Sequence, residues 1–218
     1  MTVIRLLPLD GSTPQSLIVC LHGVGADGLS LQPLGQMLRS TMPTSAVIIP
    51  DAPEPSDLGG PGWQWFSIRG VTNTDRAVRI AAAMPWLQAF MLAERKELAL
   101  DAQQVAVCGF SQGAMMALAL ADCDDPPGAI ASIAGRIAAP IAAQTDPWTR
   151  IFVSHGDCDP VVPFACLSEA GQSFRAAGYA VQEMPVRGLG HTVASIQADA
   201  VGSFFAAYLP AERLGSAA

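Results

Sequence analysis

Short apolar runs alternate with longer segments of helical periodicity along most of the chain. Apolar runs of this length are typical of strands that are buried on both faces of a sheet. The expected strands cover residues 17–21, 46–49, 105–108, 129–133 and 151–154, with a last one near 179–185. The expected helices cover residues 31–39, 75–98, 112–121 and 165–177, with a last one near 194–208. This alternation predicts an α/β fold with a mostly parallel sheet and helices on both faces, and it places functional residues at the carboxyl ends of the strands.

Two segments depart from the alternating pattern. Pro85 lies inside the segment 75–98 and is expected to kink or split that helix, because proline lacks the amide proton that a helix interior uses. Residues 51–74 are rich in Pro, Gly and Trp and show no clear periodicity. A loop of that length in a compact domain is usually functional or mobile.

The length of 218 residues suits one domain, which we expect to span residues 1–218. Half of the residues are hydrophobic, and the net charge of −7 comes with scattered basic residues. A scattered set of basic residues disfavours nucleic acid and anionic membrane surfaces as partners. The longest apolar helical stretch, 80–93, is shorter than the roughly 20 residues that span a bilayer, so no stable membrane insertion is expected.

The cysteines and the first residues bear on the cellular compartment. The five cysteines are odd in number and contain no Cys-x-x-Cys pair, so a disulfide framework is not expected. Residues 1–10 lack the basic start, long apolar run and cleavage site of a signal peptide. Both observations predict reduced thiols and a cytoplasmic location.

A Gly-x-Ser-x-Gly pattern covers residues 109–113, with Ser111 at its centre. It directly follows the expected strand 105–108 and directly precedes an expected helix, which is the setting of a nucleophile elbow. The turn is so sharp that side chains at the flanking positions would collide, and glycine avoids that collision. The pattern therefore predicts Ser111 as a nucleophile, whereas a Gly-rich turn with a capping serine is the structural alternative.

A serine hydroxyl needs a neighbouring base, and in this type of fold the chain order is Ser, then Asp or Glu, then His. His22 precedes Ser111 and His155 leaves no room for an acid in between, so His191 is the expected base. Asp157 and Asp159 both follow the strand 151–154. We assign Asp159 as the acid, because Asp157 is better placed to bond backbone amides within its own turn.

A second glycine-rich loop, residues 21–28, follows the first buried strand. No Gly-Lys-Ser/Thr pattern is present, which argues against a P-loop nucleotide site. A loop at this place can instead supply a backbone N–H to an oxyanion, and the second N–H comes from the residue after the nucleophile. The expected donors are the backbone amides of Val24 and Gln112.

These stretches together resemble the phospholipase/carboxylesterase family, which includes acyl-protein thioesterases and small bacterial carboxylesterases. The matching stretches lie in the family's order and cover nearly the whole chain: residues 21–25, 109–113, 155–163 and 190–191. The resemblance implies an α/β-hydrolase fold with no separate lid domain. It also supports Asp159 as the triad acid, with Val24 and Gln112 at the oxyanion hole.

The resulting hypothesis is a serine hydrolase that cleaves carboxylic esters or thioesters of small or medium acyl groups through Ser111, His191 and Asp159. Trp65, Phe66 and Val161 are the candidate substrate-binding residues, with Trp65 and Phe66 as core residues in the alternative reading. No cofactor and no metal are expected. A lysophospholipase, a lactone hydrolase and a non-catalytic binding protein remain as alternatives. The expected partner is a small-molecule substrate, and the oligomeric state stays open, with a homodimer among the options.

Overall fold

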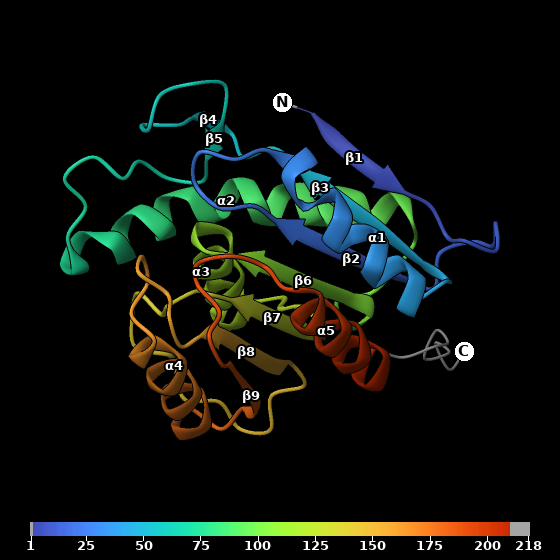
Figure 1. The fold of residues 1–218 in the computed structure, drawn as a ribbon. Helices are drawn as coiled ribbons and strands as arrows, with labels where there is room; N and C mark the ends of the chain where they lie inside the picture. Colours follow the sequence, from blue (N-terminus) through green and yellow to red (C-terminus); the bar gives the residue numbers. More distant parts are fainter. Residues whose placement is uncertain (1, 210–218) are drawn as a thin grey trace.

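The computed structural model describes residues 2–209, which form a seven-stranded sheet covered by helices (Figure 1). The strand order across this sheet is β1-β3-β2-β6-β7-β8-β9. The strands are β1 (Val3–Leu6), β2 (Ser16–Leu21), β3 (Ser45–Pro50), β6 (Val105–Phe110), β7 (Ala129–Ile133), β8 (Arg150–Gly156) and β9 (Ala180–Val186). All neighbours pair in parallel except β1, which runs antiparallel to β3 at one edge. The predicted α/β fold is confirmed, and β1 is a strand that the sequence pattern did not reveal.

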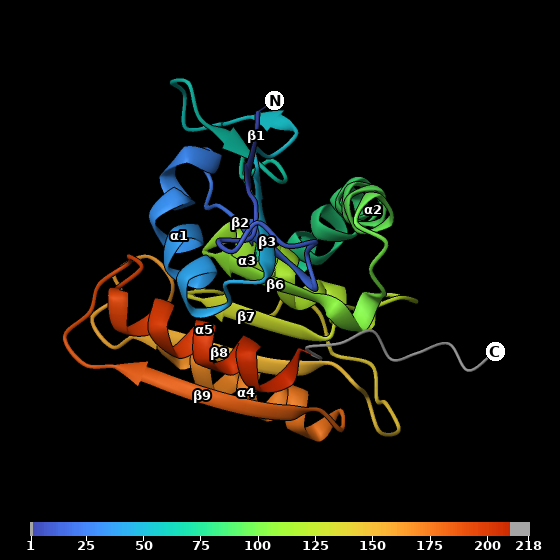
Figure 2. The ribbon, with the colours of Figure 1, turned by 90° about the vertical axis from the view of Figure 1, so that its right-hand side faces the viewer.

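Helices cover both faces of the sheet, as Figure 2 shows from the side. The helices are α1 (Gln32–Thr41), α2 (Asn73–Glu97), α3 (Gln112–Ala119), α4 (Ala165–Ala176) and α5 (Ser195–Tyr208). Helices α2, α3 and α4 pack on one face, where their apolar side chains form a core with those of the sheet. Helices α1 and α5 pack against each other and on the opposite face, over a second core. Each central strand is therefore buried on both sides, which explains its continuous run of apolar residues.

Helix α2 continues through Pro85 without a break, so the expected split does not occur. Pro85 has no amide proton to donate, so the carbonyl of Ala81 loses its intrahelical partner. Both residues lie on the exposed face of the helix. Water can hydrate that carbonyl, so the helix tolerates the missing hydrogen bond. The helix begins in a capping box, in which the side chain of Thr72 accepts from the amide of Asp75 and the Asp75 carboxylate accepts from the Thr72 amide.

The segment 51–74 contains a small hairpin, formed by β4 (Glu54–Pro55) and β5 (Trp63–Gln64). Its carboxyl-terminal part returns to the body of the molecule, where Trp65 and Phe66 join the core beneath α2. The predicted long loop is therefore anchored at this end. Within residues 2–209, no helix has both the length and the apolar character needed to cross a membrane.

Candidate active site

Ser111 occupies the turn between β6 and α3. Its backbone has φ 53° and ψ −114°, in the region of positive φ that is uncommon for residues other than glycine. Strained conformations of this kind cost on the order of 1–3 kcal/mol and persist only where the surroundings enforce them. Here the Ser111 amide donates to the carbonyl of Ile133 on β7, and the Ser111 carbonyl accepts from the amides of Ala114 and Met115. The sheet and the helix thus hold the turn from both sides.

The two glycines that flank this turn are required by close backbone approach. A Cβ atom on Gly109 would lie 2.2 Å from the carbonyl oxygen of Gly113, and one on Gly113 would lie 2.1 Å from the carbonyl oxygen of Leu21. Both distances are far below van der Waals contact. The packing of β2, β6 and α3 therefore excludes any side chain here, in agreement with the steric argument from the sequence.

The side chains of Ser111, His191 and Asp159 form a continuous hydrogen-bonded row at the carboxyl ends of β6, β8 and β9. Ser111 Oγ lies 2.9 Å from His191 Nε2, and His191 Nδ1 lies 2.7 Å from Asp159 Oδ2. The carboxylate accepts the Nδ1 proton, which leaves Nε2 unprotonated and able to accept the Ser111 hydroxyl proton. The ring of Phe110 packs at 4.9 Å from the His191 ring and supports its orientation.

The Asp159 carboxylate is completely buried, and hydrogen-bond donors surround it. Its Oδ1 accepts from the amides of Val161 at 2.8 Å and Val162 at 2.9 Å. Burial alone raises the pKa of Asp159, but the bonds from His191, Val162 and Val161 outweigh burial and lower the pKa below its ordinary value. The group is therefore an ionised acceptor at neutral pH.

Asp157 has a different environment, although it is only two residues away. It is exposed, and its Oδ1 accepts from the amide of Gly188 at 2.6 Å, in the turn that follows β9. The carboxylate that lies against His191 is thus that of Asp159, while Asp157 ties two neighbouring loops together.

The backbone amides of Val24 and Gln112 donate to no other protein atom within residues 2–209. Val24 lies in the loop after β2, and two hydrogen bonds attach this loop to Trp63. The Gly25 amide donates to the Trp63 carbonyl at 2.9 Å, and the Trp63 amide donates to the Ala26 carbonyl at 2.8 Å. Gln112 is the first residue of α3, where helix amides lack an intrahelical acceptor. Both donors are therefore unpaired: Gln112 directly follows the candidate nucleophile, and Val24 follows Gly23, on which a Cβ atom would lie 3.3 Å from Ser111 Cβ.

The side chain of Gln112 has a role that the sequence did not suggest. Its Oε1 accepts from the Trp65 amide at 2.8 Å, and its Nε2 donates to the Phe66 carbonyl at 2.7 Å. A glutamine directly after a candidate nucleophile indicates that its side chain could have a structural role at the site. The sequence alone could not identify its partners, because they lie 47 and 46 residues away. These two hydrogen bonds, called the Gln112 clamp below, hold Trp65 and Phe66 against the start of α3.

The three candidate substrate-binding residues are not brought together in one open groove. Trp65 is 1% exposed and donates its indole N–H to the His22 carbonyl at 2.8 Å, and Phe66 is 4% exposed. Both belong to the core, because the Gln112 clamp and the indole bond draw them under the site. Val161 is 62% exposed beside Asp159 and is the one of the three that a substrate can reach.

The other two histidines are buried, and the ring of each lies within hydrogen-bond distance of a backbone carbonyl. The Nδ1 of His22 lies 2.8 Å from the carbonyl of Gly23, and its Nε2 accepts from the amide of Ala52 at 2.9 Å. Burial lowers the pKa of His22, which keeps the ring neutral. His155 lies at the end of β8, with Nε2 3.0 Å from the carbonyl of Val162.

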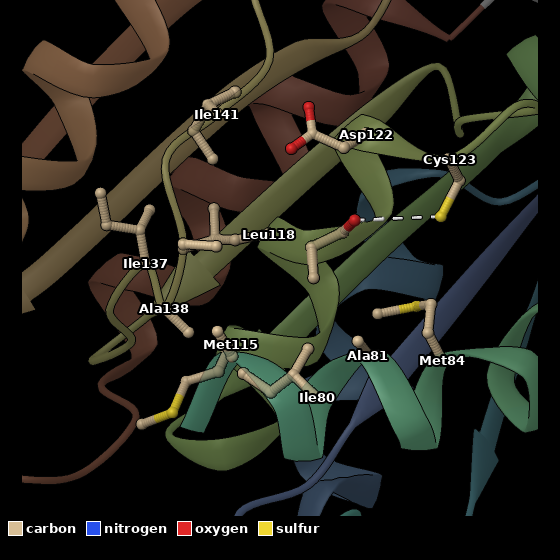
Figure 3. Close-up of a pocket in the computed structure, with 13 residues that line it drawn as sticks. Ile80, Ala81, Met84, Met115, Leu118, Asp122, Cys123, Ile137, Ala138 and Ile141 are labelled. Carbon is tan, nitrogen blue, oxygen red and sulfur yellow. Dashed lines mark hydrogen bonds between the residues drawn. The ribbon is translucent and has the colours of Figure 1, made fainter. Parts of the chain in front are cut away.

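Two cavities lie on opposite faces of the sheet. One of about 280 Å³ lies between α2, α3 and the segment 137–141, with Met115 one helical turn after Ser111 at its edge (Figure 3). Its lining is mostly apolar and includes Ile80, Met84, Leu118, Ile137 and Ile141. The other, of about 370 Å³, lies between α1 and the start of α5, next to Gly23, Phe110 and Thr192.

The sheet order, the strained serine turn and the Ser–His–Asp row define a class of protein, which is a hydrolase with the α/β-hydrolase fold. The model of the phospholipase/carboxylesterase family matches residues 10–209, so the chain belongs to this family. The esterase YpfH of Escherichia coli strain K12 is 33% identical over 184 residues, which are 82% of this chain and 77% of the relative. Acyl-protein thioesterase 1 of Saccharomyces cerevisiae is 31% identical over 175 residues, which are 72% of this chain and 76% of the relative.

Solved structures agree with this assignment. The crystal structure of esterase PE8 superposes with a TM-score of 0.86 at 30% identity, over 94% of this chain and 98% of that one. The Bacillus cereus carboxylesterase, at 18% identity, superposes with a TM-score of 0.76 over 95% of this chain and 94% of that one, and shows the same fold.

Proposed function

We propose that the chain hydrolyses carboxylic esters of small and medium acyl groups, with Ser111 as nucleophile, His191 as general base and Asp159 as the residue that orients His191. The observation that carries the proposal is the row of contacts at 2.9 Å and 2.7 Å, with the unpaired amides of Val24 and Gln112 beside it. These groups support acyl transfer, because they would supply its nucleophile, base, orienter and oxyanion donors.

The reaction has two halves. In the first, Ser111 Oγ attacks the carbonyl carbon while its proton passes to His191 Nε2, and the oxyanion accepts from the amides of Val24 and Gln112. The tetrahedral intermediate collapses, His191 protonates the leaving alcohol or thiol, and an acyl-serine remains. In the second half, water attacks the acyl-serine as His191 takes a water proton. The second tetrahedral intermediate collapses, the carboxylic acid leaves, and His191 returns the proton to Ser111 Oγ.

Asp159 supports both halves without accepting a proton. Its charge stabilises the imidazolium that forms in each step and fixes the tautomer that leaves Nε2 free. The lowered pKa of Asp159 suits this role, because the group stays ionised throughout.

The named relatives support two classes of substrate. YpfH and PE8 are esterases, and the yeast relative is an acyl-protein thioesterase. An ester and a thioester present the same carbonyl to Ser111 and differ in the leaving group. We therefore place esters first and thioesters second among the substrates of this chain.

We place the acyl arm in the cavity of Figure 3, whose mostly apolar lining includes Met115, one helical turn after Ser111. Ala138→Phe would fill this cavity, and it should reduce kcat/KM for octanoate esters far more than for acetate esters. Ala194→Phe, which narrows the cavity between α1 and α5, is the matched control and should change both substrates alike. A selective loss of octanoate activity in Ala194→Phe, with both substrates affected alike in Ala138→Phe, would place the acyl arm in the cavity between α1 and α5.

The activity itself is tested with p-nitrophenyl acetate and butyrate and with an acyl-thioester, comparing the wild-type chain with Ser111→Ala. The wild-type chain should turn over the esters with a linear steady state, and Ser111→Ala should lose this activity while keeping its melting temperature within a few degrees. Equal rates for the two proteins, or a folded wild-type chain that hydrolyses none of these substrates, would exclude the proposal.

A further inference from the structure

His155 is one of two buried histidines that the reaction above does not use, and it is the one that lies against Asp159. It is the second-to-last residue of β8, and 1% of it is exposed. Its Nε2 lies 3.1 Å from Asp159 Oδ2, the same oxygen that lies 2.7 Å from His191 Nδ1. Two histidines thus contact one carboxylate oxygen, one from the side of the nucleophile and one from inside the protein.

The contacts around His155 determine which atom bears its proton. Nε2 lies between two acceptors, the Asp159 carboxylate at 3.1 Å and the Val162 carbonyl at 3.0 Å. An unprotonated nitrogen between two oxygens would be repelled by both, so Nε2 carries the proton, donates it to the Val162 carbonyl and attracts the neighbouring carboxylate oxygen electrostatically. The Phe164 ring packs edge-on at 6.2 Å and restricts rotation of the imidazole.

Val162 links His155 to the other oxygen of the carboxylate. Its amide donates to Asp159 Oδ1 at 2.9 Å, while its carbonyl faces His155 Nε2. The carboxylate is therefore held by backbone amides on Oδ1 and lies between two imidazoles on Oδ2. The amides fix the position of Oδ1, and the direction of Oδ2 depends on what contacts it.

We propose that His155 is a positioning residue for Asp159: its Nε2–H donates to the Val162 carbonyl, and the same Nε2, 3.1 Å from Asp159 Oδ2, keeps that oxygen turned toward His191. A hydrophobic side chain of similar volume would fill the same space but would leave His191 as the only group on Oδ2. The inference rests on the proposed function, since Asp159 must orient His191 for its position to affect the rate.

The test is a double-mutant cycle on p-nitrophenyl acetate hydrolysis, with His155→Leu and Asp159→Asn alone and combined. His155→Leu should lower kcat about 10- to 100-fold, the usual loss when a supporting polar partner is removed, with little change in KM. In the Asp159→Asn background the same substitution should cause no further loss of kcat. An equal loss of kcat in both backgrounds, or no loss in the wild-type background, would overturn the proposal.

Further variants separate positioning from packing. The amide nitrogen of His155→Gln can occupy the place of Nε2 and should recover most of the rate, whereas the shorter amide of His155→Asn should not. If His155→Leu does not fold, the Gln and Asn pair is compared instead, and equal kcat values for the two would overturn the proposal. Cys166→Ala, which removes buried volume in the first turn of α4, should lower the melting temperature and leave kcat unchanged.

The proposed role of Asp159 and that of His155 can be disproved separately. If Asp159→Asn retains full activity, the proposed role of Asp159 is wrong, and so is any role of His155 that acts through it. If Asp159→Asn is strongly impaired and His155→Leu slows both backgrounds equally, only the inference about His155 is wrong.

Discussion

Asp159 and Asp157 are two residues apart, yet only Asp159 faces His191. Asp159 Oδ2 lies 2.7 Å from His191 Nδ1, whereas Asp157 Oδ1 accepts from the amide of Gly188 at 2.6 Å. Pro160 follows Asp159 and restricts its backbone to extended conformations, which narrows the directions its side chain can take. The two carboxylates therefore have separable effects.

Asp159→Asn should lower kcat by about 10⁴-fold with little change in KM, the loss found when the corresponding acid of a serine protease is replaced. Asp157→Asn should leave kcat nearly unchanged and cost about 1 kcal/mol of unfolding free energy, because only the Gly188 amide loses a charged acceptor. Steady-state kinetics and urea unfolding of the two variants provide the comparison. A large loss of kcat confined to Asp157→Asn would reverse the assignment.

Gly113→Ala should damage both stability and activity. Its Cβ would lie 2.1 Å from the Leu21 carbonyl oxygen, so the backbone of β2 or α3 must move. We expect a cost of about 3 kcal/mol or more in unfolding free energy, at the upper end of overpacking effects, and a lower kcat because the Gln112 amide moves too. Gly59→Ala is the control: its φ is +77° but its Cβ would meet nothing within 4 Å, so it should cost roughly 1–2 kcal/mol and leave kcat unchanged.

Trp65→Ala should act on stability rather than on substrate choice. The indole is fully buried and bonded to the His22 carbonyl, so its removal should cost about 3–5 kcal/mol of unfolding free energy. Val161→Ala, at an exposed position beside Asp159, should change stability by about 0.5 kcal/mol at most. A Trp65→Ala variant with normal stability and an altered preference for acyl-chain length would show that the indole lines a substrate groove after all.

The buried His22 ring should make stability depend on pH. Burial lowers the pKa of His22 in the folded state, and its Nε2 must be unprotonated to accept from Ala52. The unfolded chain therefore binds more protons, so this contribution is present above the unfolded pKa of about 6.5 and is lost as the pH falls below it, by up to about 1.4 kcal/mol per pH unit.

His22→Gln keeps an acceptor near Ala52 but does not titrate. Unfolding free energies of this variant and the wild-type chain should converge between pH 7 and pH 5, since the other histidines contribute equally to both. Parallel pH profiles for the two proteins would show that His22 titrates alike in the folded and unfolded states.

The central strands could be predicted because burial on both faces leaves an unbroken apolar run, as in β2 and β7. Strand β1 escaped prediction because it is a short edge strand with partly exposed residues, and its pairing with β3 depends on contacts more than 40 residues apart. Strands β4 and β5 have two residues each, too few for any periodicity. The unbroken course of α2 past Pro85 depended on which face of the helix is solvated, and that face is set by tertiary packing.

The candidate site was likewise predictable only in part. Ser111, Asp159 and His191 each follow a strand, so the parallel topology alone predicts that they lie at one edge of the sheet. The burial of Trp65 and the clamp by Gln112 depend on hydrogen bonds between distant segments, which no local pattern encodes. Tertiary hydrogen bonding, rather than composition, decided that these aromatic side chains belong to the core.

The most direct test of the proposed mechanism is covalent labelling of the nucleophile. A fluorophosphonate should add one adduct to the wild-type chain, peptide mass mapping should place it on Ser111, and His191→Gln should slow the labelling by orders of magnitude because the base is missing. Ester hydrolysis should disappear in step with labelling. A chain that still hydrolyses esters while Ser111 stays unlabelled, or an adduct on another residue that accounts for the lost activity, would contradict Ser111 as the nucleophile.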